Sequence, residues 1–215
     1  MRKESDTMNI LAIGAHFDDL ELGCGGTLIK HVKGGDNVTM LVVTNSSYNG
    51  PDNKIIRKSE VAYEEGKKAA GIIGARLEFL DFDTFFVPFN ESLTSIINRY
   101  INQLKIDIIY THWVHDIHRD HHYTAKNTLM AGRRVPRFLM YRSNYYDSEK
   151  VFQGNFYSDI TDEMETKVEA IKVFETELER VDYKWIEFFR NQNTNDGQKI
   201  GVKYAECFEV VRYLM

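Results

Sequence analysis

Near its start the chain reads Ile10-Leu11-Ala12-Ile13-Gly14 and continues directly as Ala15-His16-Phe17-Asp18-Asp19. The first part has the length and composition of a buried β-strand. The second part places one imidazole and two adjacent carboxylates where that strand ends, which is the composition of half a metal site. A second such cluster, Asp116-Ile117-His118-Arg119-Asp120-His121, follows another apolar run at residues 106–110. Two strand ends can therefore supply one site.

The order of apolar and amphipathic segments predicts the fold class. Short apolar runs alternate with amphipathic stretches, which is typical of β-α-β units and of a mostly parallel sheet flanked by helices. The expected strands are residues 9–14, 38–43, 76–80, 106–110 and 138–141. The expected helices are residues 26–32, a segment in which Val61, Ala62, Ala69, Ile72 and Ile73 share a face, and residues 93–104 and 123–130. We expect a Rossmann-like α/β fold.

The strand order determines where the two polar clusters lie. In doubly wound sheets, ligands bind beyond the carboxyl ends of the strands, where the strand order reverses. We expect the order 3-2-1-4-5, in which strands one and four are neighbours, so that both clusters face one crevice. Helices at residues 163–174 and 181–190 and a strand at residues 204–213 are expected to form a C-terminal α+β elaboration. We expect residues 1–215 to form a single domain.

Composition argues against several classes of function. A length of 215 residues with 43% hydrophobic residues is ample for a sizeable core. The net charge of -5, without a cluster of lysine and arginine, argues against a nucleic-acid partner. The two cysteines, Cys24 and Cys207, form no Cys-x-x-Cys, so neither a disulfide framework nor a thiolate zinc site is expected. Gly23-Cys24-Gly25-Gly26 lacks the Gly-x-Gly-x-x-Gly spacing, and no nucleotide cofactor is expected.

The chain also lacks the usual marks of export or membrane insertion. Residues 1–7 are polar and have no apolar signal-peptide core. No segment approaches the eighteen or so apolar residues that a membrane-spanning helix needs. We expect a soluble, cytoplasmic protein without a membrane span.

The two clusters contain the ligands that a catalytic zinc uses. Such a zinc binds three protein groups and leaves one position open for water or substrate. His16, Asp19 and His121 can provide the three. Asp18 would then be free to accept a proton from the water, whose pKa the metal lowers. Hydrolysis at neutral pH follows, and a His-His-Asp site accepts Fe2+ or Co2+ as well as Zn2+.

The second cluster offers more than one candidate for each role. His118 can stabilise the oxyanion or protonate the leaving amine, with Asp120 orienting its ring. Five of the seven histidines lie within eleven residues: His112, His115, His118, His121 and His122. Local sequence alone does not select the metal ligand among them.

The residues resemble the signatures of a known family, the LmbE-like or PIG-L zinc-dependent deacetylases, which remove acetyl groups from N-acetylglucosamine units. The first signature, Ala-His-Pro-Asp-Asp followed by an acidic residue and a glycine-rich helix start, is similar to residues 15–28. The second, His-x-Asp-His, matches His118-Arg119-Asp120-His121. Weaker matches are Arg57 with Glu60 on the second helix, Leu80-Asp81, Gly201, Ala205-Glu206 and Phe208. The resemblance covers nearly the whole chain.

The resemblance implies a role for each residue of the two clusters. The zinc ligands implied are His16, Asp19 and His121, the general base is Asp18, and the assisting pair is His118 with Asp120. Relatives often assemble into trimers or hexamers, so a homo-oligomer is implied.

The chain departs from the family pattern at two places. Phe17 replaces the usual proline, which loses a fixed φ angle but removes no ligand or proton-transfer group. Phe174-Glu175-Thr176-Glu177 stands where many relatives have His-x-Ser-Gln. We expect the chemistry to survive the first change and substrate or subunit contacts to differ at the second.

Together these observations predict a zinc-dependent hydrolase that removes acetate from an N-acetylated amino sugar or its conjugate. Candidate substrate contacts are Arg57, whose guanidinium suits hydroxyl or phosphate groups, and Tyr48 and Trp113, whose rings can stack on a sugar. One alternative is a metal-dependent hydrolase of another amide or ester. The other is a noncatalytic sugar-binding protein with a structural metal, against which the intact Asp18 argues.

Overall fold

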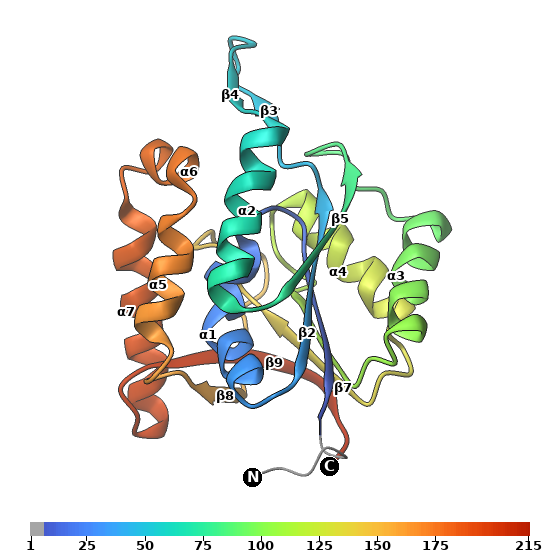
Figure 1. Ribbon diagram of the computed structural model, residues 1–215, viewed down its shortest axis with the longest axis vertical. Helices are drawn as coiled ribbons and strands as arrows, with labels where there is room; N and C mark the ends of the chain where they lie inside the picture. Colours follow the sequence, from blue (N-terminus) through green and yellow to red (C-terminus); the bar gives the residue numbers. More distant parts are fainter. Residues whose placement is uncertain (1–6) are drawn as a thin grey trace.

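Within residues 7–215, which the computed structural model describes, seven strands form one sheet in the order β5-β2-β1-β6-β7-β9-β8 (Figure 1). They are β1 (Asn9–Gly14), β2 (Asn37–Thr44), β5 (Arg76–Phe82), β6 (Ile108–His112), β7 (Arg137–Tyr141), β8 (Phe156–Asp159) and β9 (Ala205–Tyr213). Residues 1–6, which belong to the polar segment expected above not to be a signal peptide, lie outside the described residues.

The first five strands in this order are parallel to their neighbours. They are the five expected strands in the expected order 3-2-1-4-5, so the predicted fold is confirmed. The expected C-terminal strand is also present, as β9, which pairs antiparallel with β7 and with β8. Strand β8 was not predicted, because its four half-buried residues form no apolar run.

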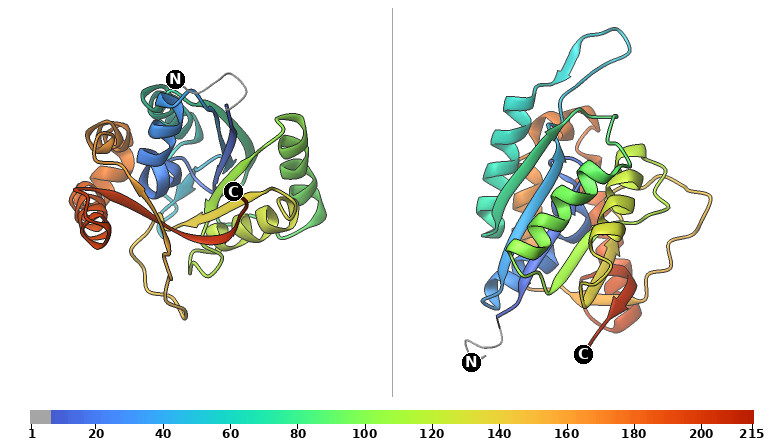
Figure 2. Two further views of the ribbon diagram at one scale, coloured as in Figure 1. Left: turned by 90° about the horizontal axis from the view of Figure 1, so that it is seen from below. Right: turned by 90° about the vertical axis from the view of Figure 1, so that its right-hand side faces the viewer.

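Helices cover both faces of the sheet (Figure 2). They are α1 (Asp19–Lys33), α2 (Ser59–Ile73), α3 (Glu91–Gln103), α4 (Arg119–Ala131), α5 (Met164–Lys172), α6 (Glu175–Arg180) and α7 (Lys184–Ile200). One apolar core lies between the sheet and α1, α2 and α5, and a second lies between the sheet and α3 and α4. Alternate residues of β1 enter the two cores, with Ile10 in the first and Leu11 in the second.

Helix α1 begins at Asp19, seven residues before the expected start at residue 26. Glycines disfavour helix interiors, which is why the sequence pointed to a later start. Here packing outweighs that preference. A Cβ on Gly23 would lie 2.2 Å from the Tyr141 ring, and one on Gly26 would lie 2.8 Å from Ile160. Only glycine allows these side chains to approach the helix so closely, and Cys24 between them is a buried core residue.

The buried face of α2 differs from the expected one. Ala62, Ala69 and Ile73 are buried, as predicted, but Val61 and Ile72 are each 39% exposed. The buried positions recur at intervals of seven and four residues, which is the helical repeat. Val61 and Ile72 are each one residue away from that stripe, so the helix turns them towards solvent.

A small hairpin occupies the stretch before α2. Strands β3 (Tyr48–Asn49) and β4 (Ile55–Arg57) pair antiparallel and project beyond the end of the sheet (Figure 1). Neither strand is among those expected from the sequence. Arg57, expected on the second helix, lies instead in β4.

A buried ion pair joins the C-terminal elaboration to α1. Lys167 and Glu206 are fully buried and lie 2.7 Å apart, Nζ to Oε1. Lys167 Nζ also donates to the carbonyl of Leu22, and Glu206 accepts from the backbone N–H groups of Gly26 and Thr27. Each charge therefore has several hydrogen-bond partners, which is the condition under which a buried pair is tolerated.

Replacing Lys167 by Met is expected to reduce the free energy of unfolding by about 3–5 kcal/mol, because Glu206 would keep its charge in a buried position without a counter-ion. Urea unfolding followed by circular dichroism measures the change. Lys172→Met on the same helix is the matched control, since its ion pair with Glu169 is exposed, and exposed pairs contribute about 0–1 kcal/mol. Equal losses of unfolding free energy in the two variants would contradict a special role for the buried pair of Lys167 and Glu206.

None of the helices within residues 7–215 combines the length and the apolar character that a membrane span requires.

Candidate metal centre and active site

The two polar clusters lie at the carboxyl ends of the neighbouring strands β1 and β6. The turn after β1 carries His16 and leads into α1, and the loop after β6 leads into α4, which carries His121. His16 Nδ1 and His121 Nε2 are 3.3 Å apart although the residues are 105 positions apart in the chain. The expected meeting of the two clusters is therefore confirmed.

Asp19 completes a triangle with these two histidines. Its Oδ2 lies 3.3 Å from His16 Nδ1, and its Oδ1 lies 3.2 Å from His121 Nε2. A tetrahedral metal with bonds of about 2.0–2.1 Å to its ligands places the ligand atoms about 3.3–3.4 Å apart. Each of these contacts is close to that spacing, and the two Asp19 contacts use different oxygens of the carboxylate.

The other nitrogen of each histidine ring is held by a carboxylate. His16 Nε2 lies 3.0 Å from Asp120 Oδ2, and His121 Nδ1 lies 3.0 Å from Asp116 Oδ2. Such a partner orients the ring and leaves the remaining nitrogen available for a metal. The expected pairing of Asp120 with His118 is wrong, because Asp120 is turned towards His16 and also accepts from the backbone N–H of Phe85.

The charge of the cluster favours a cation. Burial alone would lower the pKa of His121, but Asp19 and Asp116 outweigh it and raise the pKa to about 10. For His16 the hydrogen bonds to Asp120 and Asp19 outweigh burial in the same way and raise the pKa to about 9. With both rings neutral, the three carboxylates would leave the cluster strongly negative. A divalent cation supplies the charge that they require.

Two further sets of residues in the cluster, different from the triangle, are also close enough to hold a metal. Two sets have ligand atoms within 4.8 Å of one another: His16, His118 and His121, and Asp19, His112 and His121. His112 Nε2 accepts the backbone N–H of Ala15 at 2.9 Å, which occupies the lone pair that a metal would need. His118 stacks on His121 with 4.4 Å between ring centroids. We therefore favour His16, Asp19 and His121 as the ligands.

His112 and Ser143 form a support that the sequence did not predict. Ser143 Oγ donates to Asp19 Oδ1 at 2.8 Å and lies 3.4 Å from His112 Nδ1. Burial and the charge of His121 lower the pKa of His112 to about 4, so the ring is neutral and Nδ1 can donate to Ser143. Ser143 therefore holds one oxygen of the Asp19 carboxylate, Oδ1. The backbone N–H of His16 donates to the other oxygen, Oδ2.

Asp18 lies in the turn with an unusual backbone conformation. Its φ of 131° is sparsely populated for a residue with a side chain. It precedes α1 but makes no side-chain cap, so its carboxylate is free to face the cavity described below. Burial and the adjacent charge of Asp19 hold the pKa of Asp18 well above its usual value, although Arg57 opposes this.

Arg57 holds the turn and also lines the cavity described below, so its substrate contact stays a prediction. Its Nη1 donates to the carbonyl of Phe17 at 3.1 Å and lies 3.5 Å from Asp18 Oδ2. Its Nη2 donates to Glu65 Oε2 at 2.7 Å. Glu65 on α2 is therefore its ion-pair partner. With both terminal nitrogens engaged, Arg57 acts by positioning Asp18.

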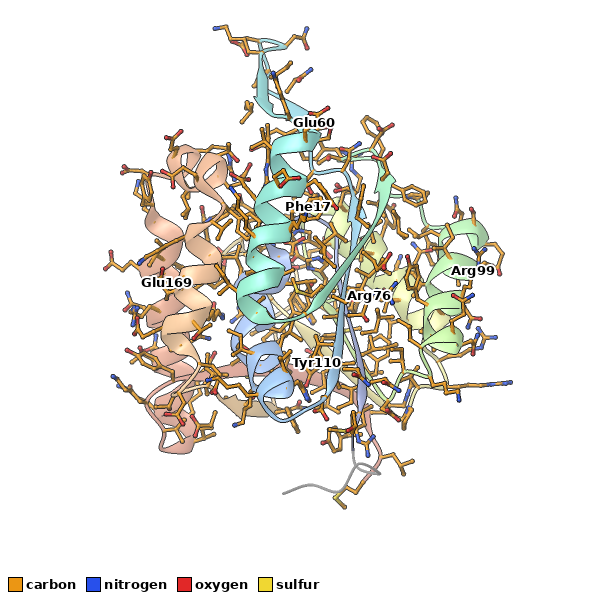
Figure 3. All side chains as sticks on the ribbon, in the orientation of Figure 1. Phe17, Glu60, Arg76, Arg99, Tyr110 and Glu169 are labelled. Carbon is orange, nitrogen blue, oxygen red and sulfur yellow. The ribbon has the colours of Figure 1, made fainter. Side chains whose placement is uncertain are left out.

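Phe17 replaces the conformational restraint of proline with packing and hydrogen bonding. Its ring contacts Tyr63 and Phe79 and fills the space that a side chain on Gly66 would need, 2.3 Å from a Cβ there. Its N–H, which proline lacks, donates to Ser46 Oγ at 2.9 Å. Figure 3 shows Phe17 in the interior beside α2.

A cavity of about 230 Å³ opens over the three candidate ligands. His16, Asp18, Asp19, His118 and His121 line it. The Nδ1 atom of His118 is buried and has no hydrogen-bond partner within residues 7–215. Burial and the charges of His121 and His16 lower the pKa of His118 to about 3, so this ring faces the cavity in its neutral form.

Of the predicted aromatic contacts, one lines the cavity and one does not. Tyr48 is among the lining residues. Trp113 is 4% exposed and packs in the core beneath α3 and α4, where its Nε1 donates to Glu209. The prediction for Trp113 is therefore wrong, because side chains alternate along a strand and the neighbour of His112 points to the opposite face.

The remaining walls come from segments that the sequence did not assign to the site. Asn144, Tyr145 and Tyr146 follow β7, and Glu177, Arg180 and Trp185 belong to the C-terminal elaboration. Glu177 is the last residue of the stretch 174–177 in which the chain departs from the family pattern. The expected difference in contacts thus falls on the cavity wall.

Residues 11–131 match the family described as PIG-L, GlcNAc-PI de-N-acetylase. This match covers more than half of the chain and includes both polar clusters. The chain belongs to the PIG-L family. The predicted family resemblance is confirmed.

Individual relatives agree with this family. The uncharacterized deacetylase YaiS of Escherichia coli is 32% identical over 62% of this chain and 73% of its own length. The diacetylchitobiose deacetylase of Thermococcus kodakarensis is 26% identical over 96% of this chain and 84% of its own length. The N,N'-diacetylchitobiose deacetylase structure from Pyrococcus horikoshii superimposes with a TM-score of 0.81 at 21% identity, covering 96% and 85% of the two chains. This last likeness extends the shared fold beyond residue 131 to nearly the whole PIG-L chain.

Proposed function

We propose that this protein is a metal-dependent hydrolase that removes acetate from an N-acetylated amino sugar of the N-acetylglucosamine type or from its conjugate. The observation that carries the proposal is that His16 Nδ1 and His121 Nε2 lie 3.3 Å apart, with one Asp19 oxygen 3.2–3.3 Å from each, beside the buried Asp18. Membership of the PIG-L family and the named activity of the Thermococcus relative support the choice of an acetamido sugar.

The donor set suits zinc, with Fe2+ or Co2+ as alternatives. A divalent metal held by His16, Asp19 and His121 would act as a Lewis acid on the amide carbonyl and would lower the pKa of water at the site. Asp116, Asp120 and Ser143 keep the three ligand side chains in position through the hydrogen bonds described above.

Asp18 accepts the proton of the attacking water. Its carboxylate lines the cavity next to the ligands and is poorly solvated, which makes it a stronger base than an exposed aspartate. As the C–N bond breaks, the same carboxyl group returns the proton to the leaving amine. The products are acetate and the free amino sugar.

His118 stabilises the developing negative charge on the carbonyl oxygen. A neutral imidazole carries one N–H donor, and the ring lies in the cavity wall beside His16 and His121. Hydrogen-bond donors aimed at the position of an oxyanion act most strongly where water is excluded.

The test is acetate release from a panel of substrates by the zinc-loaded protein. We expect release from N-acetylglucosamine, N,N'-diacetylchitobiose or a conjugate of N-acetylglucosamine, and loss of release after chelation, restored by adding zinc. N-acetyl amino acids and acetate esters in the same panel test the alternative hydrolases. Hydrolysis of those compounds alone would replace the amino-sugar proposal, and a protein that binds metal but hydrolyses nothing would favour the noncatalytic alternative.

A further inference from the structure

The cavity wall opposite the strand ends contains a polar network between β3 and α6. Glu177 is 3% exposed and accepts a hydrogen bond from the Tyr48 hydroxyl, 2.7 Å from its Oε1. Its Oε2 accepts from Arg180 Nε at 2.8 Å and from Arg180 Nη2 at 2.6 Å. All three side chains line the same cavity as Asp18. The network is thus part of the site but has no role in the chemistry assigned above.

Arg57 and Arg180 both line the cavity, but the Arg57 side chain is only 1% exposed. Both terminal nitrogens of Arg57 are engaged with the turn and with Glu65. Arg180 uses one edge of its guanidinium for Glu177, and its Nη1 has no hydrogen-bond partner within residues 7–215. Its side chain is 39% exposed and lies over the Trp185 ring, which also lines the cavity. The guanidinium therefore keeps free donors in a fixed orientation.

The charges of the network indicate which ligand it suits. Glu177 neutralises Arg180, so the pair carries no net charge. The cavity also contains the carboxyl groups of Asp18 and Asp19, which disfavour an additional anion. Neutral hydroxyl groups, which donate and accept, fit a wall that offers a tyrosine hydroxyl, a carboxylate and a guanidinium edge.

We propose that Tyr48, Glu177 and Arg180 bind the hydroxyl groups of an uncharged amino-sugar ring and so determine substrate specificity, while the acetamido group of that ring lies at the metal ligands. This inference rests on the proposed function. It assigns Arg180 and Tyr48 to substrate contact and assigns Glu177 to holding both of them. Sugars with a phosphate or carboxylate on the ring are expected to be poorer ligands than their neutral counterparts.

The experiment compares Arg180→Met and Tyr48→Phe with the wild type on N-acetylglucosamine and on N-acetylethanolamine, which has the same acetamide but no ring. Loss of a hydrogen bond from a charged group is expected to raise KM for N-acetylglucosamine about 10–100-fold in Arg180→Met. The value of kcat and the hydrolysis of N-acetylethanolamine should change little. Arg99→Met is the matched control, since Arg99 lies on the outer side of α3 (Figure 3).

Binding gives a readout that does not depend on turnover. In an Asp18→Asn background, calorimetry with N-acetylglucosamine and with N-acetylglucosamine 6-phosphate should show weaker binding when Arg180 is replaced and a preference for the neutral sugar. Unchanged binding and KM in Arg180→Met, or tighter binding of the phosphate, would overturn the inference. Wild-type protein that binds N-acetylglucosamine through Arg180 but releases no acetate would instead contradict the proposed function alone.

Discussion

Asp18→Asn is expected to lower kcat for acetate release by about 10²–10⁴-fold, the usual contribution of a positioned general base. Asparagine has nearly the same shape and keeps the turn, but its amide cannot accept a proton from water. Burial disfavours a charge at this position, so the variant should fold at least as well as the wild type. Its zinc content and its melting temperature should remain unchanged.

The measurement is steady-state acetate release together with metal analysis of the same preparation. Asp52→Asn is the matched control, because Asp52 is exposed in the hairpin and the substitution removes the same charge. Full activity in Asp18→Asn would remove Asp18 as the base. Loss of metal together with activity would show instead that Asp18 is a ligand, since the assignment above gives it no bond to the metal.

The fold and the meeting of the two polar clusters follow from features that are local in the sequence. The runs that became β1 and β6 are short and apolar, and in a parallel sheet their carboxyl ends meet at one edge. The two clusters could therefore be brought together without knowing any side-chain contact, whereas the choice of His121 among the five histidines rested on the family resemblance. The order of the first five strands came from the same alternation of strands and helices.

The wrong predictions concern residues whose position depends on a contact with a distant segment of the chain. Trp113 was expected at the cavity, but it packs in the core, where its Nε1 donates to Glu209 of β9. The glycines in α1 read as a late helix start because Tyr141 and Ile160, which require them, are far away in the chain. In both cases packing with residues distant in the sequence outweighs what the local sequence favours.

The sequence indicates less clearly which residues line the cavity wall. Ser143 and Asn144 follow the expected strand 138–141, so the same strand-end argument could have placed them at the site. Glu177 and Arg180 do not follow a predicted strand, so the strand-end argument does not place them at the site. Their position depends on how α6 packs against α2, where Thr176 donates to Glu65, and no periodicity in the sequence reveals that contact.

His121→Ala is expected to abolish stoichiometric zinc binding and, with it, acetate release. One of three protein ligands is lost, and the carboxylates of Asp19 and Asp116 lose the imidazole that separates them. Replacing an outer partner of a metal ligand typically lowers metal affinity by about 10–100-fold, so removal of a ligand itself should exceed that range. Competition with a chromophoric chelator measures the affinity.

A graded series distinguishes the ligand from its neighbours. Asp116→Asn leaves a partner for His121 Nδ1 but weakens its hold on the ring, so its zinc affinity should fall between those of the wild type and His121→Ala. His115→Ala should bind zinc as the wild type does, because His115 contacts Lys150 and Trp113 rather than the triangle. If His118→Ala instead loses zinc as completely as His121→Ala, the stacked ring is a ligand. The histidine set of His16, His118 and His121 would then replace the triangle with Asp19.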